Sequence, residues 1–150
     1  SKINRPRNSI QLGAYINLVC DENEQTALSL GKLIAGMVAH FAGLKHAPTE
    51  HLPPRLRAVA EHLQSQYDMA RHAQEAGSHL ALIDEDFVDW FSICGPPQKC
   101  IERLEPLINM GLEHIYQLGG TPVAHPHGAR QIAMVEQAQL FATDVIPHFR

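Results

Sequence analysis

The first regular segment of the chain alternates hydrophobic with polar or small residues. Residues 10–19 read IQLGAYINLV, and the apolar members of the alternation are Leu12, Ala14, Ile16 and Leu18. A period of two is typical of a β-strand with one buried face. The pattern therefore predicts a strand from Ile10 to Val19, bounded by Asp21.

A helical period replaces the alternation immediately afterwards. Apolar residues recur there every three or four positions, at Leu30, Leu33, Ile34, Met37, Val38 and Phe41. This spacing predicts a helix from about Asn23 to Ala42, with Asp21 available to cap it and Gly43 to end it. A strand followed closely by a helix is typical of an α/β unit.

The middle of the chain has weaker patterns. Residues 45–54 (KHAPTEHLPP) contain three prolines and no period, so we expect a loop. Residues 55–77 have the spacing of one or two helices. Within residues 78–94, the segment DEDFVDW indicates a capped helical turn, and FSIC at residues 91–94 is compatible with a short buried strand.

The last third again combines helix and strand signals. Gly95, Pro96 and Pro97 precede a helical period that Gly111 ends, since proline is tolerated in a first turn. A short strand is expected from about Glu113 to Leu118, then a loop over residues 119–128 and a helix over about 129–146. If residues 91–94 form a strand, the two strands and the helix between them form a parallel crossover.

Composition limits the possible functions. The chain has 150 residues and a net charge of −4, without a basic cluster, so a role in nucleic-acid binding is not expected. No apolar run approaches the roughly 20 residues of a membrane span, and no leader pattern opens the sequence. Three cysteines without a CxxC pair predict reduced thiols. We therefore expect one soluble domain over residues 1–150, located in the cytoplasm.

Two groups of polar residues could carry chemistry but have simpler explanations. His125 and His127 form an H-x-H pair with no third ligand at a suitable spacing, so no metal site is predicted among the ten histidines. The acidic run at Asp84, Glu85, Asp86 and Asp89 could supply paired carboxylates for acid/base catalysis. Capping of a helix is the simpler interpretation of this run.

Residues at the predicted strand ends are the candidate ligand contacts, because parallel α/β folds bind ligands at the carboxyl ends of their strands. These residues are Cys20, Gly95, Gln117, Gly119, Gly120 and Thr121. The glycines would allow a phosphate or ring to approach the backbone. However, Pro96 and Pro97 remove two amide donors, so plain strand-to-helix turns remain an equal alternative.

The order of these segments resembles the C-terminal part of the luciferase-like flavin- or deazaflavin-dependent oxidoreductases and monooxygenases. The segments that carry the resemblance are GAYINLVCDENEQTA, the long helices after it, DEDFVDWFSICGPPQKCIERLEPLINMGLEHIYQLGG and EQAQLFATDVIPHFR. Each segment alone is common, whereas their order and spacing together are more specific. The resemblance covers nearly all of this chain and about the last two-fifths of a typical family member.

The resemblance implies a mostly helical α/β chain that forms the C-terminal portion of a (β/α)8 TIM-type barrel. Two or three parallel strands would belong to the barrel, at residues 11–19, about 91–94 and 113–118, with a helical insertion at about 45–83. The regions of Gly95 and of Gly119 to Thr121 would then lie where such barrels often bind phosphate. The implied cofactor is FMN or a deazaflavin, acting on a small-molecule substrate. Catalytic residues stay unassigned, because much of the family pocket lies on strands outside this chain.

Two hypotheses follow. In the first, the chain is part of an oxidoreductase or monooxygenase, and the N-terminal half of the barrel or a second copy completes it. In the second, it is a non-catalytic truncated barrel that dimerises or binds a partner, because two or three strands leave open edges. An oligomer is expected in both. An unrelated helical ligand-binding domain is a weaker third alternative, which the alternating first strand disfavours.

Overall fold

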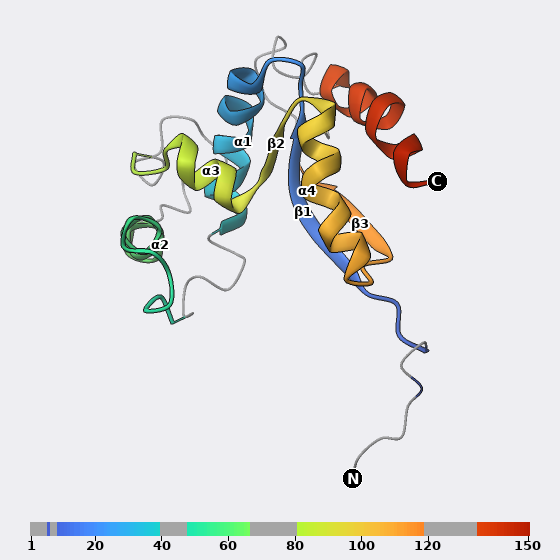
Figure 1. The fold of residues 1–150 in the computed structure, drawn as a ribbon. Coiled ribbons are helices and arrows are strands. Elements are labelled where there is room, and N and C mark those ends of the chain that lie inside the picture. The colour runs from blue at the N-terminus through green and yellow to red at the C-terminus, as the bar shows by residue number, and fades with distance from the viewer. Residues whose placement is uncertain (1–5, 7–8, 40–47, 67–80, 119–134) are drawn as a thin grey trace.

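A computed structural model describes residues 6, 9–39, 48–66, 81–118 and 135–150. These residues are mostly helical, with three strands in an open parallel sheet (Figure 1). In chain order the elements are β1 (Gly13–Cys20), α1 (Glu24–Ala39), α2 (Pro54–Gln66), α3 (Glu85–Phe91), β2 (Ile93–Gly95), α4 (Pro97–Asn109), β3 (His114–Leu118), η5 (Phe141–Val145) and η6 (Ile146–Phe149). Residues 135–140 are α-helical and lead into η5.

Strand β1 lies in the centre of the sheet, in the order β2-β1-β3. Its carboxyl end pairs with β2, where Leu18 is opposite Ile93 and Cys20 is opposite Gly95. Residues 13–17 pair instead with all five residues of β3. Each half of β1 is thus paired on a different edge, and both partners are parallel to it.

This order differs from the chain order that a closed barrel follows. Helix α4 connects β2 to β3, as expected for a parallel crossover, but the two strands are not neighbours. In a (β/α)8 barrel, consecutive strands lie side by side. Strand β3 therefore occupies the edge of β1 that a preceding strand would take in a barrel.

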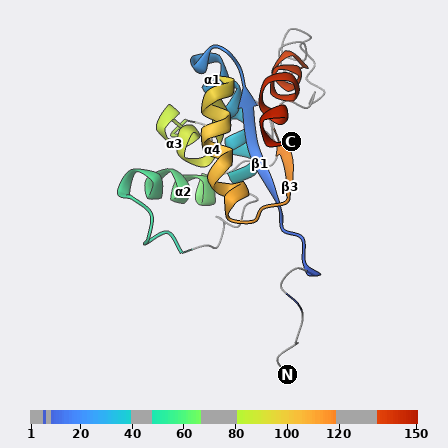
Figure 2. The ribbon, with the colours of Figure 1, turned by 45° about the vertical axis from the view of Figure 1, so that its right-hand side comes forward.

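Helices cover both faces of the sheet. Alternate β1 side chains point to opposite faces, so Val19 packs with α1, α2 and α3, whereas Leu18 and Cys20 pack with α4 and η5. In Figure 1, α1 lies to the left of β1 and α4 passes in front of the strand, and Figure 2 gives the view turned by 45°. Phe141 and Val145 of the C-terminal helical segment pack with buried residues of α4. The two hydrophobic clusters are therefore separated by the sheet.

Most predicted elements are present. The first strand is predicted over residues 10–19 and observed over 13–20, and residues 91–94 supply β2 at 93–95. The DEDFVDW segment is a capped helix, because Asp84 Oδ1 accepts the Phe87 amide at 2.9 Å. Parts of the insertion predicted at about 45–83, the loop at 119–128 and the start of the last helix lie outside the described residues.

Candidate functional site

The carboxyl ends of β1 and β2 meet at one edge of the sheet. Cys20 and Gly95 are register partners, and the amide of Asp21 donates to the Gly95 carbonyl at 3.0 Å. The Cys100 thiol contacts the same carbonyl at 3.5 Å. Gly95 has a φ of 146°, a conformation that favours glycine. Cys20 and Gly95, the first two candidates from the sequence, thus lie side by side.

Gln117 brings β3 to the same region. Its side-chain nitrogen donates to the carbonyl of Leu18 in β1, at 3.3 Å, beyond the last paired residue of the two strands. The remaining candidates, Gly119, Gly120 and Thr121, lie outside the described residues. Three of the six candidates are therefore placed, all at the carboxyl ends of the three strands.

A cavity of about 300 Å³ opens beside the end of β1. Six residues from two segments far apart in the sequence line it: Cys20, Asp21, Glu22, Glu136, Gln137 and Leu140. Strand β1 and the turn after it provide one wall, and the helical residues before η5 provide the other. Among the residues that the structure describes, the lining contains three carboxylates and no basic side chain.

Asp21 holds the two walls of the cavity together. Its Oδ1 accepts the Asn23 amide at 2.8 Å, and its Oδ2 accepts a hydrogen bond from Nε2 of Gln137. The prediction that Asp21 caps α1 is therefore wrong. Asn23 caps this helix instead, because its side-chain oxygen accepts the Thr26 amide at 3.0 Å and leaves Asp21 available to the cavity.

Gln137 is a site residue that sequence reasoning missed. Its side chain is only 4% exposed, and its Oε1 has no hydrogen-bond partner among the described residues. A buried acceptor without a donor costs about 1–3 kcal/mol. The helical spacing near the end of the sequence places Gln137 in a helix, but only the fold shows that its side chain reaches Asp21.

The thiols of Cys20 and Cys94 are held in the protonated form, whereas the hydrogen bond with Cys20 lowers the pKa of Cys100. Cys20 is buried, and a hydrogen bond with Cys100, burial and the charges of Glu22 and Asp144 raise its pKa. Burial raises the pKa of Cys94 to about 12. The arrangement does not activate Cys20 or Cys94 as a nucleophile, since the thiolate is the reactive form.

The turn from β2 to α4 does not form an anion site among the described residues. Pro96 caps the helix and Pro97 is its first residue, so two amide donors are missing. The nearby cation, Lys99, already lies 2.6 Å from both Glu24 and Asp89. Burial opposes its charge, but these two carboxylates outweigh burial and raise the pKa of Lys99. The described residues near Gly95 therefore offer no free amide or cation that would bind a phosphate at this turn.

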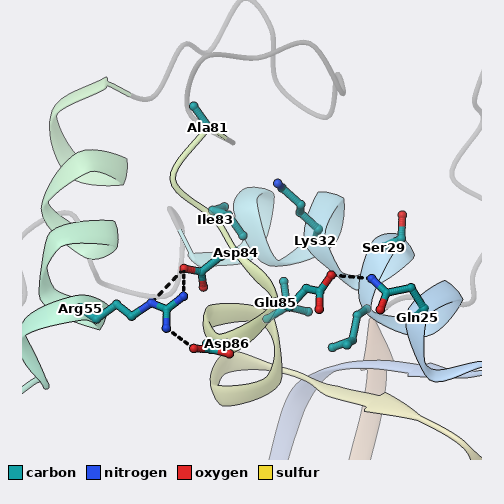
Figure 3. Close-up of a pocket in the computed structure, with 11 residues that line it drawn as sticks. Gln25, Ser29, Lys32, Arg55, Ala81, Ile83, Asp84, Glu85 and Asp86 are labelled. Atoms are coloured by element: carbon teal, nitrogen blue, oxygen red, sulfur yellow. Dashed lines mark hydrogen bonds and ion pairs between the residues drawn. The ribbon is translucent and has the colours of Figure 1, made fainter.

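A larger cavity of about 550 Å³ lies among α1, α2 and the start of α3 (Figure 3). No strand residue lines it. In Figure 3 the guanidinium of Arg55 reaches both Asp84 and Asp86, while Gln25 donates to Glu85. Ion pairs and hydrogen bonds between helices thus occupy most of the polar groups in its wall.

These contacts explain the acidic run found in the sequence. Burial raises the pKa of Asp84, but the Phe87 amide and Arg55 outweigh burial and hold it below its ordinary value. Asp86 also pairs with Arg55, and Asp89 pairs with Lys99. The carboxylates are engaged in capping and in ion pairs, which favours the structural interpretation over paired acid/base catalysis.

Two further kinds of site receive no support from the described part of the chain. No group of three or more His, Cys, Asp or Glu side chains there is arranged to hold a metal ion. Among the helices that the structure describes, none is long and apolar enough to cross a membrane.

Comparison with solved structures relates this fold to part of a TIM-type barrel. One matching chain is the coenzyme F420-dependent tetrahydromethanopterin reductase from Methanopyrus kandleri, with a TM-score of 0.54 and 24% sequence identity. The match covers 95% of the present chain and 37% of the reductase chain.

A curated sequence gives the same relationship. The chain is 25% identical, over 146 residues, to 5,10-methylenetetrahydromethanopterin reductase of Methanopyrus kandleri. The aligned region covers 97% of the chain and 37% of the relative. No family model matches the sequence. The predicted resemblance is confirmed as homology to an F420-dependent reductase of the luciferase-like family. The chain spans little more than a third of the length of this relative.

Proposed function

We propose that the chain is the C-terminal portion of a deazaflavin-dependent oxidoreductase that acts on a small-molecule substrate. The observation that carries this proposal is the homology over 146 residues to a reductase that depends on coenzyme F420. A deazaflavin is favoured over FMN because the related structure is F420-dependent. Oxidoreduction by hydride transfer is favoured over monooxygenation for the same reason.

The strand ends are the part of this chain that we assign to ligand binding. In parallel barrels the carboxyl ends of the strands face the ligand, and Cys20, Gly95 and Gln117 lie there. Gly119, Gly120 and Thr121 follow β3 directly in the sequence and extend the same proposal. When bound, the cofactor would supply the hydride donor or acceptor, and these residues would position it. We assign no catalytic residue.

The hydrogen-bond acceptors at the end of β1 fit one part of such a cofactor better than another. Asp21 and Glu22 accept hydrogen bonds, so they suit the N–H edge of a polar ring. They would repel a phosphate. An anionic portion of the ligand would therefore be bound by residues outside this cavity.

A complete barrel requires more strands than the three that the described residues form, because a barrel of this class has eight. The proposed partner is the remainder of the barrel, or a second copy of the chain. Both outer strands of the sheet, β2 and β3, have one edge that is unpaired among the described residues. In a barrel with the strands in chain order, β3 would pair with the free edge of β2, and an added strand would take its place beside β1.

The test is a titration of the protein with coenzyme F420, followed by the change in deazaflavin fluorescence, with FMN as the matched competitor. We expect saturable binding that FMN displaces poorly. The same titration is repeated with any N-terminal portion of the barrel that copurifies with the chain. Binding by neither preparation would overturn the proposal for this protein.

The exposed face near the start of β1 supports a second candidate, a module that dimerises or binds a partner. Tyr15 and Tyr116 are register partners with ring centroids 5.1 Å apart, and they are 72% and 55% exposed. Leu12 is also largely exposed at this end. Light scattering of the wild type and of Tyr15→Ser distinguishes the candidates: this one requires an oligomer that the substitution weakens, and a wild-type monomer excludes it.

A further inference from the structure

Strand β3 has an outer edge that is unpaired among the described residues. Within them it pairs with β1, and Figure 1 shows it on the side of β1 away from α2 and α3. The amide of His114 donates to the carbonyl of Leu12, so the backbone groups of His114 point towards β1. Because these groups alternate along a strand, the N–H and C=O of Ile115 point to the outer edge. Such an edge is a template for a further strand.

The features that commonly protect an edge strand from association are absent from β3. Its sequence, HIYQL, contains no lysine, no acidic residue and no proline. A groove of about 330 Å³ lies beside Ile115. Its described lining is mostly apolar and has one acidic and one basic side chain, Glu113 and Arg150. Two copies of this surface would therefore meet without a net repulsion between like charges.

The opposite face of the same edge carries exposed aromatic rings. Tyr116 is 55% exposed, and its ring centroid lies 5.1 Å from that of Tyr15 on the neighbouring strand. Both rings lie on the face opposite to Ile115, because alternate side chains of a strand point to opposite faces. The row of rings crosses the strands and reaches the outer edge at Tyr116. An aromatic side chain placed across this edge would extend the row.

A second copy of the chain matches both faces of this edge at once. A two-fold axis beside Tyr116 makes the two β3 strands antiparallel, and each Tyr116 then lies opposite its counterpart. The tyrosines of both copies would form one continuous row. On the other face, Ile115 of each copy would lie beside the apolar groove. Strands from the remainder of a parallel barrel would run in the same direction as β3 and would lack this symmetry.

We propose that two copies of the chain associate by antiparallel pairing of their β3 edges, with Tyr116 at the two-fold axis, so that the two sheets join into one. The proposed interface deepens the dimerising candidate described above and rests on it, but it does not depend on binding of a cofactor. Each copy contributes an edge of only five residues, so we expect a dimer that dissociates in the micromolar range or above.

Cysteine cross-linking tests the position of the axis. In Tyr116→Cys the two new thiols would lie directly opposite each other, close enough for a disulfide. The matched control is Tyr15→Cys, one strand further in, where the thiols would be about three strand spacings, or roughly 14 Å, apart. The three native cysteines are buried and should not contribute.

Copper phenanthroline serves as the oxidant, and it takes up two electrons for each disulfide while two protons are released. Non-reducing electrophoresis should show at least about tenfold more covalent dimer for Tyr116→Cys than for Tyr15→Cys. Equal cross-linking of the two variants would overturn the proposed axis.

A charge at the axis gives a second test that does not depend on a new thiol. Tyr116→Lys would place two like charges directly opposite each other, whereas Tyr15→Lys keeps them apart. Sedimentation velocity up to about 0.5 mM should show a dissociation constant at least about tenfold higher for Tyr116→Lys and less than about threefold higher for Tyr15→Lys. Both side chains are more than half exposed, so both variants should fold, and thermal melting verifies this.

The outcomes separate this interface from the proposed function. A wild-type chain that stays monomeric up to about 0.5 mM would overturn both the interface and the dimerising candidate, and the titration with coenzyme F420 would still decide the oxidoreductase proposal. A dimer that Tyr116→Lys does not weaken would retain the dimerising candidate and remove only the β3 edge as its interface.

Discussion

With the amide of Asn17 oriented so that both of its ends find partners, its side-chain nitrogen donates to the carbonyl of Leu118 at 3.3 Å, at the last register position shared by β1 and β3. In the same orientation its oxygen accepts hydrogen bonds from the Ser92 hydroxyl and the Ala35 amide. Asn17 is 4% exposed. One buried amide therefore connects β1 with β3, with α1 and with the residue that precedes β2.

This arrangement predicts a large effect of Asn17→Ala. The substitution leaves the Ser92 hydroxyl without its partner and opens a small void, so the free energy of unfolding should fall by about 2–3 kcal/mol. Urea denaturation measures the change. Asn109→Ala, at an exposed position in α4, is the control and should change stability by less than about 0.5 kcal/mol. Equal effects of both substitutions would show that the buried amide contributes nothing.

Gly31 is predicted to be required by close packing of α1 against β2. A Cβ at this position would lie 2.5 Å from Sγ of Cys94 and 3.1 Å from Cγ1 of Val88. Helix propensity alone would make Gly31→Ala stabilising by about 1 kcal/mol. The steric conflict costs about 1–3 kcal/mol, so we expect a net loss of stability in thermal melting.

A second substitution tests the cause of this loss. Cys94→Ala removes the sulfur atom that the new methyl group would meet. In the double variant Gly31→Ala and Cys94→Ala, the combined destabilisation should be smaller than the sum of the two single effects. Strict additivity would refute the packing explanation.

The ion pair of Asp84 and Arg55 predicts a specific dependence on pH. The pKa of Asp84 is lower in the folded protein than its ordinary value of 3.8, so its charge stabilises the fold at neutral pH. This contribution is complete above the unfolded pKa of about 3.9 and is lost as the pH falls through the lower folded pKa. Asp84→Asn retains a capping side chain but removes the charge.

We therefore expect Asp84→Asn to be less stable than the wild type at pH 7, and the difference to shrink as the pH falls below about 4. Urea denaturation at a series of pH values measures it. Because Asp84 is partly exposed and Arg55 is exposed, the effect should also decrease with added salt. A difference independent of pH would mean that capping, not charge, is responsible.

The three cysteines should resist alkylation in the folded protein. All are buried. Burial raises the pKa of Cys94 to about 12, and the hydrogen bond between Cys20 and Cys100 raises the pKa of Cys20 and lowers that of Cys100, so burial alone protects Cys100. At pH 8, iodoacetamide should label none of the three within minutes, whereas denaturant should expose them all. Mass spectrometry gives the stoichiometry. Rapid labelling of Cys20 in the native protein would contradict its burial.

Local patterns were sufficient to predict most elements of the fold. The period of two from Ile10 to Val19 reports one face of β1, and the helical spacing from Leu30 onward reports the buried side of α1. Both signals depend on side chains close in sequence. The strand order could not be obtained in this way, because alternation shows which face is buried but not which edge is paired.

Only three described residues of the candidate site were predictable from the sequence. Cys20, Gly95 and Gln117 follow from the rule that parallel strands expose ligand residues at their carboxyl ends. Glu136 and Gln137 have no such signal, since they lie in a helix and reach the site only through packing. The hydrogen bond between Gln137 and Asp21 spans 116 positions in the sequence, and no local period encodes it.

The pairing of β1 with β3 has a consequence for the rate of assembly. All five residues of β3 are in register with residues 13–17 of β1, on the edge that a preceding barrel strand would occupy. An incoming strand cannot bind there until β3 dissociates from that edge. Dissociation of β3 from β1 would then limit the rate at which a barrel is completed. At high partner concentration, the observed rate of association would reach a plateau equal to the rate of this dissociation.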